Sequence, residues 1–445
     1  MPLITQAPRG TRDVLPSECH ELRHIEQTAL EVAETFGFSE IRTPVFEHTE
    51  LFERSVGETT DVVQKEMYTF FDKGGRSVTL RPEGTAGAAR ACLEHGLLNE
   101  ALPRKVSYIV KNYRYEKPGA GRFREHSQFG VECFGAALPA ADAEVIALAV
   151  ELFAALSLTD VRLEINSIGC PECRKKYLEA LRGFFGARKD RLCETCLGRL
   201  ERNPMRILDC KSEICGGIAK EAPTMLEYIC ADCAAHFDGV KALLDALGIA
   251  YAVNPRIVRG LDYYTRTVFE FISELPELQG VTLCGGGRYD GLIEELGGAR
   301  TPSLGFGMGL ERVWLQLQAL KAPLQEPSRC ELFIAAMNDA CLTKAAQLAS
   351  AVRGDGWHAQ YDVTGRSLKA QMKFADKIDA RYTLVLGDNE LRDQRAKLKE
   401  MATGEEELVT LTDFAEEFED VMNRRMHKEF MEEFKELHGS CEDMF

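Results

Sequence analysis

The sequence has no long hydrophobic run. None of its apolar stretches approaches the roughly 18 residues that a helix needs to cross a bilayer, and residues 1–10 lack the apolar core of a signal peptide. The composition shows no bias toward disorder either, because 45% of the residues are hydrophobic and 28% are charged. These absences predict a globular protein of the cytoplasm with no membrane partner. Its 445 residues are enough for roughly two to four domains.

Positive charge is also scarce. The 54 Lys and Arg residues are outnumbered by 70 Asp and Glu residues, which gives a formal net charge of -16. Binding to nucleic-acid phosphates depends on Lys and Arg, so the overall charge argues against such a partner unless the chain has local basic faces. Lys369, Lys373 and Lys377 recur every four residues on a predicted helix and would form one such face. The same stripe fits an ordinary solvated helix face.

The fingerprints of common nucleotide-binding loops are missing as well. The GGGRYDG sequence at 285–291 contains neither a Walker lysine nor a dinucleotide motif. It belongs to one of three blocks, at 258–271, 284–292 and 304–312, in which strand-like residues alternate with glycines. Glycine lets the backbone approach a ligand closely, so these blocks are candidates for the lining of a binding site.

The densest polar pattern lies in residues 108–135. Pro118, Gly119 and Gly121 suit a chain reversal, which predicts an antiparallel pair of strands. Side chains alternate across a strand. The even-numbered face carries Arg114, Glu116, Arg122, Arg124, His126, Gln128 and Glu132 around Gly130, and the odd-numbered face, predicted to be packed, carries Tyr113, Tyr115, Phe123, Phe129, Val131 and Cys133.

A charged strand face can simply be solvated. The mixture of fixed cations, carboxylates and an amide around a glycine instead favours a site for a polyanion beside an ammonium group. In the TLRPEGTA sequence at 79–86, a strand is predicted to end and a helix to begin. Glu83 and Thr85 would either cap that helix or bind a ligand.

Several other segments have the periodicity of regular elements. Residues 16–36 are predicted to form a helix, 38–46 a strand that contains Pro44, 141–156 an amphipathic helix and 161–166 a strand. After a linker at 323–327, strands at 332–337, 358–361 and 382–386 alternate with helices at 342–353 and 367–378. This alternation predicts a small α/β domain. The last 30 residues are predicted to form a partly docked helix.

Cysteine is concentrated in one segment. Eight of the 15 cysteines fall within 64 residues, and six of them form C-x-x-C pairs. In a reducing compartment this density favours metal ligands over disulfides. We expect two four-sulfur zinc sites, one formed by Cys170, Cys173, Cys193 and Cys196 and the other by Cys210, Cys215, Cys230 and Cys233. Other pairings, an iron–sulfur cluster, buried free thiols and a redox role are the alternatives.

Three segments resemble the motifs of class II aminoacyl-tRNA synthetases. The strand with Pro44 resembles motif 1, residues 113–116 resemble motif 2, and residues 305–312 resemble motif 3. TLRPEGTA, RGLDYYTRTVFE and GGGRYDGL are similar to blocks of the histidyl-tRNA synthetases. The matches span residues 8–320, and the C-terminal α/β domain resembles that family's anticodon-binding domain.

The resemblance implies an α+β fold, with an antiparallel sheet flanked by helices, in a homodimer formed partly through motif 1. It implies a catalytic core in two parts, residues 1–168 with motifs 1 and 2 and residues 241–325 with the histidine-specific blocks and motif 3. A Cys-rich insertion at 169–240 separates the two parts. An anticodon-binding domain at 328–425 and a helical tail at 426–445 follow.

The reaction that the resemblance implies is activation of L-histidine by ATP, which is bound with Mg, and transfer to the 3′ end of tRNA(His). The carboxylate of histidine attacks the α-phosphorus, so the enzyme supplies positioning and charge stabilisation rather than a nucleophile. Arg259 and Arg114 are the implied catalytic cations. The implied ATP-binding residues are Arg114, Glu116, His126 and Arg312, and the implied histidine-binding residues are Glu83, Gly84, Thr85, Arg114, Gln128, Glu132, Arg259, Tyr263 and Tyr264.

Within that set, Glu83 and Thr85 suit the α-ammonium, and Glu132 with Tyr264 suits the imidazole nitrogens. A wrong substrate would leave such buried polar groups unpaired, a readout worth roughly 10⁴ to 10⁵ in specificity, so no editing domain is expected. The chain departs from the family at His126 and Ser127, where phenylalanine and histidine are common, and its loop at 117–121 lacks the polar residue expected to meet the tRNA acceptor end.

A non-catalytic paralogue, the regulatory subunit of ATP phosphoribosyltransferase, is the alternative reading. Such paralogues typically lack the anticodon domain and lose the amino-acid and ATP motifs. Glu83, Arg114, Arg259 and Arg312 are all present here, and the C-terminal domain follows, which favours the catalytic enzyme.

Overall fold

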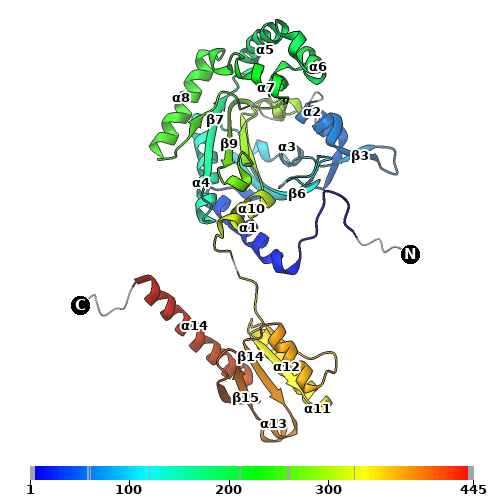
Figure 1. Ribbon diagram of the computed structural model, residues 1–445, viewed down its shortest axis with the longest axis vertical. Coiled ribbons are helices and arrows are strands. Elements are labelled where there is room, and N and C mark those ends of the chain that lie inside the picture. Colours follow the sequence, from blue (N-terminus) through cyan, green and yellow to red (C-terminus); the bar gives the residue numbers. More distant parts are fainter. Residues whose placement is uncertain are drawn as a thin grey trace, which may run out of the picture. The chain divides into compact units, whose positions relative to one another are not determined.

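The computed structural model describes residues 6–57, 60, 62–119, 121–208, 210, 212–257, 261–324 and 326–438. The chain forms two compact units, Met1–Glu326 and Pro327–Phe445, which can be followed by colour in Figure 1. Among the described residues, no helix combines the length and the apolar character needed to cross a membrane.

Two sheets form the framework of the first unit. Its strands are β1 (Ser39–Glu40), β2 (Phe46–His48), β3 (Tyr68–Phe71), β4 (Ser77–Leu80), β5 (Arg104–Tyr113), β6 (Glu125–Phe134), β7 (Val161–Ser167), β8 (Ala252–Val253), β9 (Thr265–Ser273), β10 (Thr282–Arg288) and β11 (Ser303–Gly309). The large sheet has the order β1-β5-β6-β11-β10-β9-β7-β8, and the small sheet has the order β2-β4-β3. All neighbours are antiparallel except the edge pairs β1 with β5 and β7 with β8. The predicted antiparallel α+β fold is confirmed.

Helices surround the large sheet. They are α1 (Pro16–Thr35), α2 (Thr49–Val56), α3 (Thr85–Glu94), α4 (Pro139–Ala155), α5 (Pro171–Gly186), α6 (Glu194–Arg202), α7 (Glu213–Lys220), α8 (Ala231–Ala246), α9 (Leu292–Glu295) and α10 (Leu310–Leu320). Short 3-10 turns lie at Leu97–Asn99, Lys189–Arg191, Pro204–Ile207, Met225–Glu227 and Pro276–Leu278, and a π-helical turn lies at Val62–Glu66. The helices α5, α6 and α7 of the Cys-rich segment gather at one end of the sheet (Figure 1).

The two faces of the large sheet bury different elements. One face packs against α1, α4, α8 and α10, and the odd-numbered β6 residues Phe129, Val131 and Cys133 belong to that core. On the other face α3 contributes Ala88, Ala89 and Cys92, which pack near Val106 and Tyr108 of β5. The even-numbered side chains of β6 therefore point into the space beneath α3, where the site forms.

The central hairpin matches its sequence prediction. Strands β5 and β6 pair in an unbroken antiparallel register from Arg104 opposite Phe134 to Tyr113 opposite Glu125. The predicted packed face holds for Phe129, Val131 and Cys133 but not for Tyr115, which is 55% exposed. Strand β5 ends at Tyr113, so the alternation of side chains between the two faces does not extend to Tyr115. The Tyr115 ring packs against a cation instead of the core, with the Arg124 guanidinium 3.8 Å from its centre.

The strand predicted at residues 38–46 is wrong. Only Ser39–Glu40 pairs with β5, and a second short strand begins at Phe46. In the segment between them, two carbonyl groups bond to a side chain rather than to a neighbouring strand: Arg81 Nη1 donates to the carbonyl oxygens of Thr43 at 2.9 Å and Pro44 at 3.0 Å. Pro44 itself has no N–H to offer a neighbouring strand.

Helix α4 is present, but it is not amphipathic as expected. It lies among the sheet, α1 and α8, so most of its sides are buried, including one charged residue, Asp142. That carboxylate accepts from the fully buried Arg288 at 2.8 Å and lies 3.2 Å from His236 Nε2. The Asp142–Arg288 ion pair joins α4 to β10, and the contact between Asp142 and His236 joins α8 to both. Loss of one partner of a buried pair costs about 3–5 kcal/mol.

The second unit is the predicted α/β domain with two additional strands. Its elements are β12 (Leu332–Ala336), α11 (Asp339–Gly354), β13 (Ala359–Tyr361), α12 (Leu368–Lys377), β14 (Tyr382–Leu386), α13 (Asp388–Asp393), β15 (Arg395–Glu400), β16 (Glu406–Thr410) and α14 (Phe414–His438). The sheet order is β13-β12-β14-β15-β16. The first three strands are parallel, and β15 and β16 add an antiparallel edge.

The terminal helix α14 docks through its first half. Phe418, Val421 and Met422 are buried, whereas Phe430 is exposed. The helix is continuous from Phe414 to His438, so the boundary expected between residues 425 and 426 falls inside it.

Candidate active site

A polar cleft of about 280 Å³ opens beside the central hairpin. Its walls come from the segment between β5 and β6, from the start of β6, from β9, β10 and β11, and from the start of α10. Of the residues predicted from the sequence, it brings together Arg114, Glu116, His126, Gln128 and Arg312. These include the whole predicted ATP-binding set.

Backbone carbonyl groups hold the two arginines of this cleft. Arg114 Nε donates to the Pro82 carbonyl oxygen at 2.7 Å. Arg312 donates from Nε to the carbonyl oxygen of Gly121 at 3.1 Å and from Nη1 to that of Thr282 at 2.6 Å. Arg114 also lies 3.7 Å from the Glu116 carboxylate. The cleft thus holds two oriented cations, and guanidinium groups are suited to phosphate oxygens.

His126 supplies a neutral ring to the same cleft. Burial, followed by the positive charges of Arg114 and Arg312, lowers the pKa of this imidazole to about 3. The ring is therefore uncharged throughout the neutral range and can offer a flat aromatic face without adding to the positive charge.

A buried cluster of tyrosines and carboxylates lies next to the cleft. We call it the tyrosine cluster, and its members are Glu83, Thr85, Tyr108, Glu132, Tyr263, Tyr264 and Tyr289, each no more than 9% exposed. Glu132 accepts the Tyr108 hydroxyl at 2.7 Å on one oxygen and the Tyr289 hydroxyl on the other. Burial raises the pKa of Glu132 to about 8. The ring centres of Tyr263 and Tyr264 are 4.7 Å apart.

Glu83 caps helix α3. Its two oxygens accept the backbone N–H groups of Thr85 at 2.7 Å and Ala86 at 2.9 Å. Burial raises the pKa of this carboxyl, and the hydrogen bonds from the two backbone N–H groups lower it. The capping role weighed in the sequence is therefore real. It fixes the carboxylate at the helix start, one residue from the Pro82 carbonyl that anchors Arg114.

Gln128 lies between the cleft and the tyrosine cluster. Its Oε1 accepts from Asn112 on the adjacent strand, and its side chain lines the cleft. Glycine at 307 on the neighbouring strand leaves room for this side chain, because a Cβ there would lie 1.6 Å from Gln128 Nε2 and the amide would have to move. Gly130 has a similar role, since a Cβ there would lie 2.4 Å from the Tyr108 ring. The gap predicted at Gly130 is thus filled by a tyrosine of β5.

Arg259 lies outside the described residues, as do its neighbours at 258 and 260. Its predicted role stays a prediction. The described residues that follow it, beginning with Leu261 in the cleft wall, lead directly to Tyr263 and Tyr264.

Comparison with known proteins identifies the family. A family model described as Histidyl-tRNA synthetase matches residues 10–193 and 199–313, and one described as Anticodon binding domain matches residues 331–420. The chain belongs to the histidyl-tRNA synthetase family. Its C-terminal unit accordingly contains the anticodon-binding domain that the sequence predicted.

Individual histidyl-tRNA synthetases support this assignment over nearly the whole chain. A histidine–tRNA ligase of Clostridium novyi is 52% identical and covers 93% of this chain and 98% of its own length. One of Caldanaerobacter subterraneus is 53% identical, with 91% and 97% covered. The crystal structure of apo S. aureus histidyl-tRNA synthetase matches with a TM-score of 0.80 at 39% identity, covering 93% of this chain and 100% of that one.

Sequence reasoning missed four side chains of this synthetase site. Tyr108 and Tyr289 hold Glu132, Glu270 lines the cleft, and Glu311 accepts the Ser127 N–H at 2.7 Å. Tyr289 and Glu311 lie more than 150 residues from their partners in sequence. Tyr108 could have been found, since it lies on the same strand face as Gly130 and directly opposite it.

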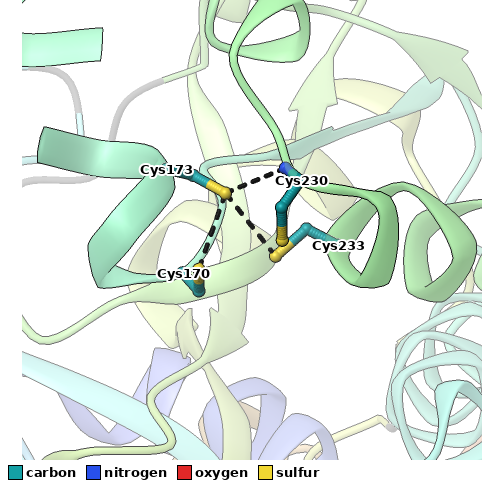
Figure 2. Close-up of side chains that lie close together, drawn as sticks. All are labelled: Cys170, Cys173, Cys230 and Cys233. Carbon is teal, nitrogen blue, oxygen red and sulfur yellow. Dashed lines mark hydrogen bonds between the residues drawn. The ribbon is translucent and has the colours of Figure 1, made fainter. Parts of the chain in front are cut away.

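The Cys-rich insertion of this family member contains two groups of four cysteines, as predicted, but with a different pairing. The first cluster is Cys170, Cys173, Cys230 and Cys233, and the second cluster is Cys193, Cys196, Cys210 and Cys215. In each, the four sulfur atoms lie within 4.8 Å of one another. The predicted pairing joined neighbours in sequence. In the structure the insertion leaves the core at α5 and returns at α8, which brings its first and last C-x-x-C pairs together (Figure 2).

Both clusters have a donor set that fits a metal ion. Three C-x-x-C pairs place the first cysteine at a helix N-cap and the second in the first turn. Backbone N–H groups face the sulfurs: Cys230 N–H donates to Cys173 Sγ at 3.0 Å and Cys193 N–H to Cys215 Sγ at 3.2 Å. The amide of Cys233 lowers the pKa of the Cys230 thiol to about 7, and that of Cys196 does the same for Cys193. Burial raises the pKa of the Cys173 and Cys233 thiols in the first cluster and of Cys196 and Cys215 in the second. Four convergent cysteine sulfurs are nevertheless the donor set that suits zinc.

Proposed function

We propose that the chain activates L-histidine with ATP and transfers the histidyl group to the 3′-terminal adenosine of tRNA(His). In the first step a carboxylate oxygen of histidine bonds to the α-phosphorus, and the bond to the pyrophosphate oxygen breaks. In the second step the ribose hydroxyl takes the histidyl group, and AMP leaves. The observation that carries the proposal is the adjacency of a cleft with two fixed arginines and a buried carboxylate–tyrosine cluster in a member of this family.

In this proposal the cleft binds ATP. Arg114 and Arg312 stabilise the charge on the phosphates, Glu116 accepts from the adenine amino group, and the neutral ring of His126 stacks on the base. Arg259 would supply a further cation at the α-phosphate. ATP is bound with Mg²⁺, an ion that takes carboxylate and phosphate oxygens. Glu270 in the cleft wall is a carboxylate of that kind.

The tyrosine cluster then receives histidine. Glu83 and Thr85 face the α-ammonium, and Glu132 and Tyr264 pair with the imidazole nitrogens. Gly84, Gln128 and Tyr263 complete the pocket. Since Glu132 already accepts two hydroxyls and a carboxylate has about four acceptor positions, an imidazole N–H can be added without displacing either tyrosine. A side chain without that N–H leaves the acceptor unpaired, which is the basis of selectivity.

The second unit binds the anticodon arm of the tRNA. Lys369, Lys373 and Lys377 are all exposed on α12, which makes this helix a basic face of an acidic chain. We expect Lys373→Glu to raise KM for tRNA(His) in aminoacylation and to leave pyrophosphate exchange unchanged, since phosphate contacts depend on cations. An unchanged KM for tRNA(His) would remove α12 from the proposed interface.

The enzyme acts as a homodimer in this proposal. Val45, Phe46, Phe70 and Phe71 are exposed on and beside the small sheet, and Phe71 is 75% exposed. Adjacent exposed apolar side chains are typical of an interface. Val45 and Phe46 belong to the segment that resembles motif 1. Light scattering of the purified protein should give twice the chain mass, and Phe71→Asp should lower it. Phe430→Asp, an exposed phenylalanine of α14, is the matched control. A monomeric, active wild type would contradict the dimer.

Location and metal content complete the proposal. The reaction belongs to the cytoplasm, where tRNA and ATP are found and thiols stay reduced. All cysteines of the described chain are free of disulfides. We propose structural zinc in both cysteine clusters.

The regulatory-subunit alternative is not favoured. It predicts a decayed nucleotide site, whereas Arg114, Glu116 and Arg312 line one cleft and the anticodon-binding domain is present.

Histidine-dependent exchange of pyrophosphate into ATP tests the proposal, with all twenty amino acids assayed separately. Exchange with histidine alone is the expected result. No exchange with any amino acid, in folded protein, would overturn the catalytic function and favour the regulatory-subunit hypothesis.

A further inference from the structure

The first cysteine cluster has the dimensions of a tetrathiolate metal site. Cys170 Sγ lies 3.5 Å from Cys173 Sγ, which lies 4.0 Å from Cys233 Sγ. A tetrahedron with zinc–sulfur bonds of about 2.3 Å has sulfur–sulfur edges of about 3.8 Å, whereas a disulfide needs about 2.05 Å. Figure 2 shows the four side chains converging from the starts of two helices, α5 and α8.

The residues beside this cluster hold the backbone of the histidine-specific segment 261–266. Arg174 follows Cys173 directly, and it donates to the carbonyl oxygens of Asp262 at 3.1 Å and Tyr264. On the other side of Cys170, the Gly169 carbonyl accepts the Arg266 N–H at 2.8 Å, and the Ile168 N–H donates to the Arg266 carbonyl at 2.7 Å. Four hydrogen bonds thus join the start of α5 and the residues just before it to the segment that carries Tyr263 and Tyr264.

The contact between the second cluster's part of the insertion and this segment is of another kind, a pair of charged side chains. Arg206, from the 3-10 turn between Cys196 and Cys210, lies 3.8 Å from the Asp262 carboxylate. Within the described chain, no hydrogen bond between two backbone groups joins residues 193–220 to residues 261–266, whereas two such bonds join residues 168 and 169 to Arg266. The two clusters therefore have the same four ligand types but differ in their contacts with residues 261–266.

We propose that the first cluster binds zinc and thereby positions Tyr263 and Tyr264 for histidine, while the second cluster binds zinc to stabilise the insertion alone. Four thiols lose their protons to solvent as the ion binds. The fixed sulfurs set the angle at which α5 starts, and Arg174 transmits that position to the carbonyl groups of residues 262 and 264. The positioning role rests on the proposed histidine activation, whereas the zinc content does not.

Two serine variants compare the clusters directly. Cys230→Ser and Cys193→Ser each alter a half-buried cysteine at a helix N-cap, where serine is also a good cap. Plasma mass spectrometry of gel-filtered protein should find about two zinc ions per wild-type chain and about one in each variant. In pyrophosphate exchange, Cys230→Ser should raise KM for histidine about tenfold with KM for ATP nearly unchanged. Cys193→Ser should have a clearly smaller effect. Cys19→Ser, in α1 and outside both clusters, controls for loss of a thiol.

Arg174→Ala tests the link even if Cys230→Ser fails to fold. It should retain about two zinc ions and still raise KM for histidine. Metal-free wild type, iron in place of zinc, or equal effects of Cys230→Ser and Cys193→Ser on KM for histidine would overturn the inference. Wild type that contains zinc but shows no exchange would instead contradict the proposed function and leave both metal sites standing.

Discussion

The cleft and the tyrosine cluster lie side by side but handle charge in opposite ways. In the cleft, carbonyl groups orient the guanidinium groups of Arg114 and Arg312, which line open space, and a guanidinium is not deprotonated in proteins. In the tyrosine cluster, the carboxyls of Glu83 and Glu132 are buried, and burial raises the pKa of each. Fixed cations suit a ligand that is always anionic, such as a triphosphate. Buried carboxyls, whose charged form burial disfavours, suit a ligand that brings its own cation.

Arg312→Ala should give the largest effect, because it removes a cation from the cleft only. We expect histidine-dependent exchange to fall about 10²- to 10³-fold, with histidine binding by calorimetry unchanged. Arg122→Ala removes an exposed cation from the same wall and should change exchange far less. Equal losses in the two variants would mean that the cleft acts through net charge rather than through oriented groups.

Glu132→Gln should affect the other region. The amide cannot accept both tyrosine hydroxyls and an imidazole N–H, so KM for histidine should rise roughly 10- to 100-fold, the equivalent of about 1.5–3 kcal/mol for a hydrogen bond to a charged group. KM for ATP should stay near the wild-type value. Glu125→Gln, at the start of the same strand, is the matched control. A shift in KM for ATP as large as that for histidine would show that the two regions are not separable.

Glu132→Gln should also change how the free energy of unfolding depends on pH, because it removes a buried carboxyl that can titrate. Burial raises the pKa of Glu132 from 4.5 to about 8, so between these values the folded chain keeps a proton that the unfolded chain has released. The free energy of unfolding therefore falls as the pH rises through this window and levels off above it. Thermal unfolding should show the wild type losing stability relative to Glu132→Gln between about pH 5 and about pH 8. A constant difference would refute the raised pKa.

His126→Phe should give the smallest effect. The pKa of about 3 means that the ring is already neutral, so the substitution changes ring size and not charge. We expect KM for ATP to fall about two- to threefold, with the same ratio at acidic and neutral pH. A ratio that changes with pH would show that His126 titrates in the cleft.

The sequence predicted the parts of this molecule that depend on local pattern. Alternation along residues 125–134 identified which β6 side chains, Phe129, Val131 and Cys133, face the hydrophobic core, and Pro118 with its glycines located the chain reversal. Alternation failed at Tyr115, where pairing stops, and at residues 38–46, where the distant Arg81 takes the carbonyl groups. The short, highly charged strands β15 and β16 carried too weak a pattern to be predicted.

Contacts across the chain were the part that sequence could not supply. The two sets of four cysteines were recognised, but their pairing depended on where α5 and α8 begin in space. Glu132 was identified, whereas Tyr289, which holds it, lies 157 residues away. Resemblance to the family supplied roles for individual residues, and the structure showed which of these residues line the same cleft.

The insertion leaves and re-enters the core at almost the same point, since the Cys230 N–H donates to Cys173 Sγ at 3.0 Å. A segment whose two ends meet can change in length over evolutionary time without shifting the sheet that it interrupts, because loop closure costs little for extra residues. The first cluster thus lies at the junction between the catalytic sheet and the inserted segment. Grafting an unrelated helical module between the end of α5 and Cys230, which keeps Arg174 in place, is a corresponding opportunity for protein engineering.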